Sequence, residues 1–116
     1  MGAVPFETLA FGTTPDEAFT SAVEDAKHRH GHNGYTGTIA EKTSFTVIPE
    51  HEHKGRQKLT VARELIDHED QRIQRKRGPA GAINCSGTTA AKRYREQHGL
   101  DGKHGGVWLF FGWAAH

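Results

Sequence analysis

The segment "VWLFFGWA", residues 107–114, is apolar throughout. Alternate side chains of an extended strand point to opposite faces of a sheet. The large side chains therefore divide between two faces, with Val107, Leu109, Phe111 and Trp113 on one and Trp108 and Phe110 on the other. A strand that is apolar on both faces is typical of the middle of a sheet with helices packed against it. We expect this segment to be a central strand.

The clearest helix lies between residues 13 and 31. The sequence "TTPDEAF" supplies a threonine N-cap, a proline at the first helical position and two acidic residues in the first turn. Apolar residues then recur at helical spacing, at Ala18, Phe19, Ala22, Val23 and Ala26. Gly31 is a typical helix stop.

Strands and one more helix are predicted between these two segments. "VPFETLAF", residues 4–11, indicates a strand with a bulge or an irregular start, because its apolar positions change parity between Phe6 and Leu9. "YTGTIAEK", residues 35–42, and "TSFTVI", residues 43–48, indicate two adjacent strands. Residues 57–73 are predicted to form a helix whose apolar face consists of Leu59, Ala62, Leu65, Ile66 and Ile73.

The remaining segment adds a strand and a short helix. We expect a strand from Ala82 or Ile83, then a helix within residues 86–100 with a threonine N-cap and a C-cap at Gly99. Its inward-facing residues are predicted to be Ala90, Ala91 and Tyr94.

Together these elements predict one α+β domain over residues 1–116, with a single, mostly antiparallel sheet and helices packed on one face. The first six elements match a ferredoxin-like βαββαβ order, followed by an extra short helix and strand. One layer of helices is too small to cover two large apolar faces. We therefore expect part of the C-terminal aromatic strand to form a homodimer or partner surface.

The composition narrows the compartment and the partners. Fifteen Lys and Arg residues nearly balance fourteen Asp and Glu, so no overall field draws the chain to nucleic acid. Cys85 is the only cysteine, which excludes an internal disulfide and favours a reducing compartment. The longest apolar run, residues 107–115, is shorter than the roughly 20 residues of a membrane span. We expect a cytoplasmic protein without a membrane partner.

Two basic runs, "RIQRKRG" and "KRYR", are the best binding candidates. The first places Arg72, Arg75, Lys76 and Arg77 at a predicted helix end, and the second places Lys92, Arg93 and Arg95 around Tyr94, a candidate stacking residue. Were the runs neighbours, their surface would attract phosphate backbones or an acidic protein patch. No nucleic-acid-binding signature accompanies them, so a solvated charged face or a protein contact is favoured over nucleic acid.

The histidine-rich segment "HRHGHNG" resembles a ligand set but fails a geometric test. On a continuing helix His30 would lie on the buried side and His28 on the opposite side, so the histidines cannot converge, and we predict no bound metal or cofactor. In "DHED", Asp67 and Asp70 are three residues apart and would share a helical face. The weak catalytic candidates are therefore His30, His32, Asp67 and Asp70, provided that they face one cleft.

The glycine-rich segments "HGHNGYTG" and "GPAGA" are compatible with phosphate binding but match no nucleotide-binding pattern. Helix capping by Gly31, a turn at Gly34 and a bulge at Gly37 explain the first segment equally well. Ser86, Thr88 and Thr89 beside Cys85 imitate a nucleophile loop, although no base is identifiable, and Cys85 is expected to be a small buried residue.

Four segments, "FGTTPDEAF", "GYTGTIAEK", "GPAGAI" and "WLFFGWA", together resemble a family of small uncharacterised proteins from bacteriophages of actinobacteria and their prophages. The resemblance implies a phage origin and no catalytic role. Two departures from it add positive charge. Arg77 precedes Gly78 where the family pattern has an aromatic residue, and residues 84–104 resemble an insertion.

The sequence therefore favours a small phage-type binding protein over an enzyme. We expect it to dock on a host protein or nucleoprotein complex in the host cytoplasm, as an inhibitor or anti-defence protein, through its basic surface. One alternative is a metal-assisted phosphoester hydrolase that uses His30, His32 and the acidic residues of the second helix. Another is a nucleotide-sequestering protein that uses the glycine loops.

Overall fold

The aromatic segment forms β4 (Gly106–Ala115), which lies in the interior of a four-stranded sheet with the order β1-β4-β3-β2. The computed structural model describes residues 2–100 and 105–116. The other elements are β1 (Ala3–Gly12), α1 (Pro15–His30), η1 (Ile39–Glu41), β2 (Phe45–Val47), η2 (Glu50–Glu52), α2 (Lys58–Asp67), β3 (Ala80–Asn84) and α3 (Thr89–His98). β4 is antiparallel to both β1 and β3, whereas β2 is parallel to β3. The predicted α+β class, the mostly antiparallel sheet and the central strand are confirmed, and a ferredoxin-like arrangement stays a prediction.

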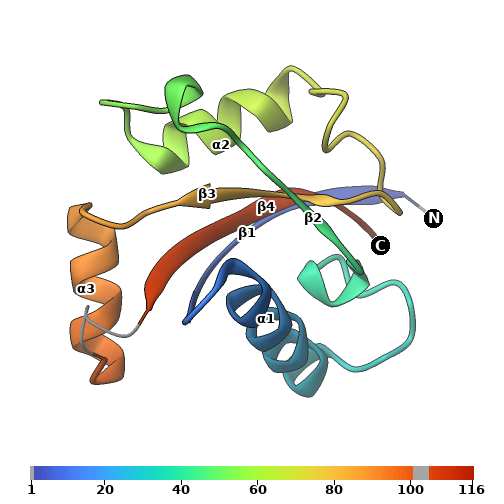
Figure 1. Ribbon diagram of the computed structural model, residues 1–116. Helices are drawn as coiled ribbons and strands as arrows, with labels where there is room; N and C mark the ends of the chain where they lie inside the picture. Colours follow the sequence, from blue (N-terminus) through green and yellow to red (C-terminus); the bar gives the residue numbers. More distant parts are fainter. Residues whose placement is uncertain (1, 101–104) are drawn as a thin grey trace.

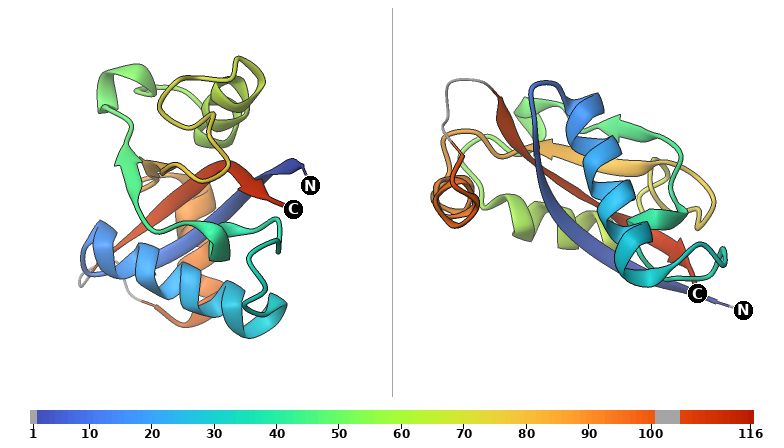
Figure 2. Two further views of the ribbon diagram at one scale, coloured as in Figure 1. Left: turned by 90° about the vertical axis from the view of Figure 1, so that its right-hand side faces the viewer. Right: turned by 90° about the horizontal axis from the view of Figure 1, so that it is seen from below.

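Helices cover both faces of the sheet, which corrects the prediction of a single helical layer. α1 lies against one face and α2 against the other, while α3 lies at one end of the sheet (Figures 1 and 2). The alternation along β4 decides which core each side chain joins. Phe110 packs with Phe19 of α1, whereas Leu109 and Phe111 pack with Ile66 of α2.

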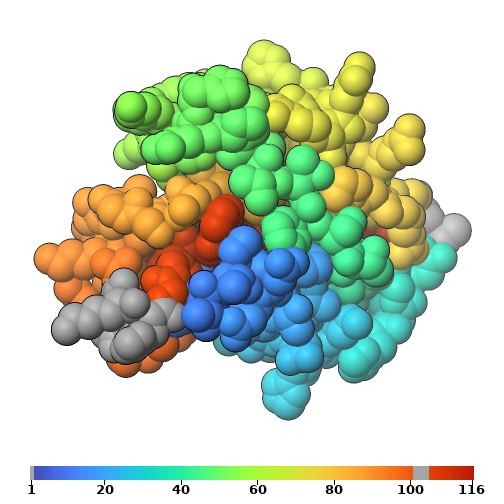
Figure 3. All heavy atoms as spheres, in the orientation of Figure 1, coloured from blue at the N-terminus to red at the C-terminus, as the bar shows by residue number. Residues whose placement is uncertain are grey.

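The two helical layers bury most of the apolar side chains of β4, although Trp108 and Trp113 are only partly buried. Phe110 and Phe111 are fully buried, and both edges of β4 are paired with neighbouring strands. In the space-filling view only a small part of β4, in red, is visible between its neighbours (Figure 3). The prediction of a homodimer surface on this strand therefore finds no support. No helix among the described residues is long and apolar enough to cross a membrane.

Both helices predicted from capping signals form as expected. The hydroxyl of Thr14 accepts a hydrogen bond from the backbone N–H of Glu17, and Gly31 ends α1. The hydroxyl of Thr88 accepts a hydrogen bond from the backbone N–H of Ala91, and Gly99 ends α3. One detail of α3 is wrong, because Ala90 is exposed rather than inward-facing.

Residues 35–42 do not form the predicted strand. Gly37 has a left-handed backbone, with φ of 69°, and its N–H donates to the carbonyl oxygen of Ala115. The hydroxyl of Thr38 then accepts a hydrogen bond from the N–H of Ala40 and starts η1. These local contacts turn the chain, so only the short strand β2 follows. β1 also lacks the predicted bulge, because its register with β4 runs without interruption from Ala3 opposite Ala115 to Gly12 opposite Gly106.

α2 is shorter than predicted and ends at Asp67 instead of residue 73. Glu69 adopts a left-handed backbone, with φ of 49°, which a helix cannot contain. Ile73 is still buried, but it reaches the core from the following loop. Leu59 was expected on the apolar face of α2 and is 40% exposed.

Candidate functional site

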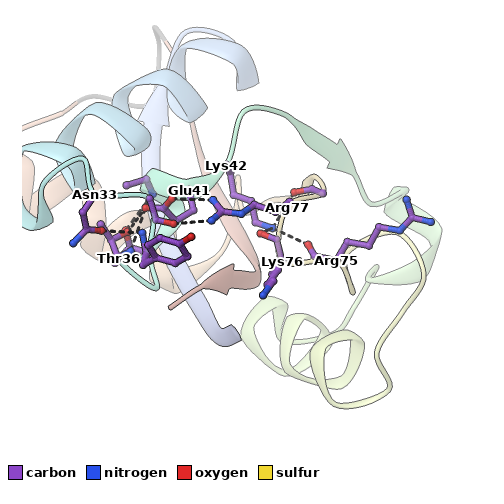
Figure 4. A network of polar contacts seen from close by, with 12 residues as sticks. Asn33, Thr36, Glu41, Lys42, Arg75, Lys76 and Arg77 are labelled. Atoms are coloured by element: carbon purple, nitrogen blue, oxygen red, sulfur yellow. Dashed lines mark hydrogen bonds and ion pairs between the residues drawn. The ribbon is translucent and has the colours of Figure 1, made fainter. Parts of the chain in front are cut away.

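The first basic run lies in a loop before β3 and not at a helix end, which corrects the prediction. This basic loop (residues 72–78) is held from below by the side chain of Lys42. The Lys42 ammonium donates hydrogen bonds to three carbonyl oxygens of the loop, those of Arg75 (3.1 Å), Lys76 (3.3 Å) and Gly78 (2.9 Å). Figure 4 shows these contacts converging on one point beneath the loop. The backbone of the loop is therefore fixed where its cationic side chains emerge.

The buried position of Lys42 disfavours the charged form of its side chain. It is only 2% exposed, and its nitrogen lies 6.0 Å from the centre of the Phe6 ring. Burial, together with the nearby positive charge of Arg77, lowers the pKa of Lys42 from 10.5 to about 8. The three carbonyl oxygens replace the water that the ammonium has lost.

Arg77 continues the network at the surface. Its guanidinium donates to the carbonyl oxygen of Gly34 at 2.9 Å and forms an ion pair with Glu41 at 3.4 Å. It also lies 5.3 Å from the centre of the Tyr35 ring, within the range of a cation–π contact. Glu41 in turn accepts hydrogen bonds from the backbone N–H and the hydroxyl of Thr36. Residues 33–41 and the basic loop therefore form one connected structure.

The exposed part of this structure is a basic-aromatic patch, which we define as Tyr35, Arg75, Lys76 and Arg77. Tyr35 is 48% exposed, and the three cations are exposed as well. Arg75 and Arg77 extend to opposite sides of the loop (Figure 4). Only Arg77 of the three forms an ion pair within the described residues. The patch thus presents an aromatic ring and two unpaired cations to solvent.

The side chain of Arg72, by contrast, binds acidic residues of the protein itself. Its guanidinium makes two hydrogen bonds of 2.8 Å to the carboxylate of Glu52, and it also binds both carboxylate oxygens of Asp70, at 2.9 and 3.0 Å. The hydrogen bonds from Arg72 lower the pKa of Asp70 and of Glu52. Arg72 therefore ties η2 to the beginning of the basic loop, and its guanidinium is already occupied by two carboxylates of the protein itself.

The second basic run is not a neighbour of the first. Lys92, Arg93, Tyr94 and Arg95 lie on α3, at the end of the sheet away from the basic loop (Figure 1). Tyr94 stacks on His98, with ring centres 4.2 Å apart, and is half-buried, so burial raises its pKa. The two runs form separate surfaces, and the combined surface considered from the sequence does not exist.

The structure also separates the weak catalytic candidates. His30 is exposed and not on the buried side, and His32 is exposed in the turn that follows α1. Asp67 ends α2 on the opposite face of the sheet, and Asp70 lies beyond the helix in its contact with Arg72, so the two acids share no helical face. Within residues 2–100 and 105–116, no group of three His, Cys, Asp or Glu side chains is placed to hold a metal ion.

The glycine segments have structural roles. The backbone N–H groups of Gly31, Gly37 and Gly78 already donate to backbone carbonyl oxygens, which removes them as phosphate donors. Cys85 is buried as predicted, and burial raises the pKa of its thiol to about 11. The thiol is therefore protonated near neutral pH and is a poor nucleophile.

No protein-family model, curated protein or solved structure matches this chain. The resemblance to phage proteins therefore stays a prediction.

Three residues of the candidate site were missed in the sequence. Tyr35, Glu41 and Lys42 lie in the segment that was expected to form a strand. Nothing in the local sequence marks Lys42, because its three acceptors are 33 to 36 residues further along the chain. The only signal for Tyr35 in the sequence is an aromatic residue next to a glycine, in "GYTG".

Proposed function

We propose that this protein is a non-enzymatic binding protein that docks on an acidic macromolecular surface through the basic-aromatic patch. The observation that carries this proposal is the buried ammonium of Lys42, which fixes three carbonyl groups of the loop that displays the patch. A loop that is ordered before binding loses less conformational entropy when it binds. Burying a lysine solely to stabilise the fold would be a costly solution.

The chemistry of the patch suits a protein partner. Tyrosine and arginine are the residue types that most often dominate binding energy at protein interfaces. Arg75 and Lys76 add charge that no acidic residue among those described neutralises through a salt bridge. The partner should therefore present carboxylates around an apolar hollow that accepts the Tyr35 ring.

The resemblance to phage proteins supports a host protein or nucleoprotein complex in the host cytoplasm as this partner. Under that proposal, the protein acts as an inhibitor or anti-defence protein. Arg77 stands where the family pattern has an aromatic residue, so this chain would recognise a more acidic surface than its relatives do.

Affinity purification from an actinobacterial host lysate, with and without nuclease, tests the proposal. We compare the wild type with a double charge reversal, Arg75→Glu with Lys76→Glu, because both side chains are exposed and neither is part of an ion pair in the described residues. The matched control is Lys92→Glu with Arg93→Glu on α3, which changes the net charge equally at the other end of the sheet.

The first variant should lose the captured partner and the control should keep it. In a binding titration with the purified partner, we expect the patch variant to bind about tenfold more weakly or worse, as hot-spot residues do. Equal capture by both variants would reject the patch as the binding surface. Loss of capture after nuclease treatment would instead identify nucleic acid as the partner.

A second variant tests the role of the fixed loop separately. Lys42→Met keeps all four patch residues but removes the three hydrogen bonds below the loop. We expect faster hydrogen exchange in residues 75–78. We also expect weaker partner binding, because a mobile loop loses more conformational entropy when it binds. Unchanged binding by a protein with a demonstrably mobile loop would show that preorganisation is unimportant.

A further inference from the structure

A cavity of about 550 Å³ lies between the first turns of α2 and α3, away from the basic-aromatic patch. Its floor comes from the sheet and the segment after β3, through Leu9, Leu109 and Cys85. Leu59 of α2 and Ala90 of α3 line its sides. This volume lies within the range of about 300–1,000 Å³ that is typical of small-molecule sites.

The lining of the cavity is mostly apolar and electrically neutral at its base. Leu59 is 40% exposed although it is an apolar residue on a helix, and it borders this cavity. Because burial raises the pKa of the Cys85 thiol to about 11, the thiol forms an uncharged part of the wall. An apolar group placed here would cover Leu59 and exclude water from Leu9 and Leu109.

One edge of the cavity carries positive charge. Lys58 lines it, and the ammonium donates one hydrogen bond, of 2.7 Å, to the carbonyl oxygen of His53. An ammonium has three donors, so two remain. No carboxylate within the described residues forms a salt bridge with Lys58, whereas the neighbouring Arg56 is paired with Glu64 at 2.6 Å.

The backbone of the first turn of α2, at the same edge of the cavity, also favours an anion. Gln57 is the N-cap of α2, and its side-chain oxygen accepts a hydrogen bond from the hydroxyl of Thr60 at 3.1 Å but caps no backbone N–H of the first turn. The first N–H groups of a helix need an external acceptor. A bound anion beside Lys58 would lie close to these donors, since Gln57, Lys58 and Leu59 all line the cavity.

We propose that this cavity binds a small amphiphilic anion, with its apolar body against Leu9, Leu59 and Leu109 and its anionic group beside Lys58. Three features of the cavity favour this class of ligand. They are its size, its apolar floor and the lysine in its lining that forms no salt bridge within the described residues. A neutral apolar molecule would leave Lys58 unpaired, and a purely ionic one would leave the floor exposed to water.

Two fluorescent probes of nearly equal shape test the proposal. Anilinonaphthalene sulfonate carries an anionic group, and phenylnaphthylamine is the same aromatic body without it. The folded wild type should bind both with an increase in fluorescence, and the sulfonate should bind more tightly. No binding of the sulfonate to the folded wild type would overturn the proposal.

Three variants locate the probes and identify the charge that holds them. Ala90→Trp fills the cavity from an exposed position and should abolish binding of both probes. Gln97→Trp places the same ring at an exposed site on the same helix, outside the cavity lining, and should bind like the wild type. Lys58→Met should weaken sulfonate binding by about tenfold, the effect of losing one charged hydrogen bond, without changing phenylnaphthylamine binding.

Two results in these variants would contradict the proposal. Undiminished sulfonate binding by Ala90→Trp would place the probe elsewhere on the protein. Equal weakening of both probes in Lys58→Met would show that the cavity has no preference for an anion. Urea unfolding first establishes that each variant is fully folded under the conditions of the binding assay, because partly folded chains also bind these dyes.

Discussion

The ammonium of Lys42 donates a hydrogen bond to the carbonyl oxygen of Gly78 at 2.9 Å, across 36 residues of sequence. This contact joins the end of η1 to the residue just before the Pro79 that leads into β3. The same ammonium also holds Arg75 and Lys76 through their carbonyl oxygens. A single buried charge therefore organises the surface that we propose for binding.

The stability of the protein should depend on the ionisation of Lys42. Its pKa is about 8 in the folded protein, lowered from 10.5 by burial and by Arg77. Between these values the unfolded chain binds more protons than the folded one, so the free energy of unfolding rises with pH. From pH 8 to 10.5 the wild type should therefore gain stability relative to Lys42→Met.

Urea unfolding of the two proteins across this pH range measures the difference. Cys85 and Tyr94 also have raised pKa values, but both proteins contain them, so their effects cancel in the comparison. Parallel stability profiles for the wild type and Lys42→Met would contradict a lowered pKa at Lys42.

Replacement of Arg72 should destabilise the protein by about 1–3 kcal/mol, because it breaks charged hydrogen bonds to two carboxylates. The Arg72 side chain is 32% exposed and makes two-point contacts with both Glu52 and Asp70. Arg72→Met tests this prediction in thermal or urea unfolding. Arg72→Lys should recover only part of the loss, because an ammonium cannot reproduce the fork of a guanidinium.

The matched control for Arg72 is Arg63→Met. Arg63 also pairs with a carboxylate, that of Glu7, but its side chain is 61% exposed. Exposed ion pairs contribute little to stability. The loss in Arg72→Met should also shrink as the pH falls, because the lowered pKa values of Glu52 and Asp70 stabilise the fold only while both groups are ionised. Equal losses in the two methionine variants would contradict the proposed role of Arg72.

Gly37 should tolerate alanine less well than Gly34. Both have left-handed backbones, with φ of 69° and 85°, and a side chain costs about 1–2 kcal/mol there in each case. A Cβ atom at Gly37 would also lie 2.8 Å from Cγ2 of Val4 and 3.0 Å from Cδ2 of His116, whereas at Gly34 it would meet nothing within 4 Å.

We therefore expect Gly37→Ala to lower the free energy of unfolding by about 1 kcal/mol or more beyond Gly34→Ala, as overpacking does. Urea unfolding of both variants gives this difference directly. Similar values would mean that the segment can shift away from Val4 and His116 at no cost.

Sequence patterns predicted the elements that are specified by neighbouring residues. α1 has its cap, its first-turn acids and its apolar stripe within 17 residues, from Thr14 to the last residue of the helix, His30. β4 was identified as central because both of its faces are apolar, a property that needs no knowledge of its partners. Local signals of this kind predict the folded structure correctly where tertiary contacts do not override them.

One error arose where a distant contact decided the local structure, and another where a non-glycine residue adopted an uncommon backbone conformation. Residues 35–42 have the composition of a strand, but Gly37 bonds to Ala115 at the other end of the chain and turns the backbone. α2 ends early because Glu69 adopts a left-handed conformation that glutamate rarely takes. Neither event leaves a trace in the neighbouring sequence.

The candidate site was predictable only in part. The cations of the basic loop were found because they are consecutive in the sequence, but Arg72 could not be separated from them without its contacts to Glu52 and Asp70. The distance between the two basic runs depends on the path of the whole chain (Figure 2). Lys42 owes its role entirely to residues that follow it by more than 30 positions.

The central position of β4 also determines when this protein can fold during synthesis. Within the part of the chain that the structure describes, β1 is the first strand to be made and pairs only with β4, and β3 needs β4 as its second partner. A ribosome adds about 5–20 residues per second, so β1 waits several seconds without its partner strand. Contacts between such distant segments also make folding slow. The newly made chain therefore exposes the unpaired edge of β1 until residues 106–115 have been made, and an unpaired strand edge is a site at which chains aggregate.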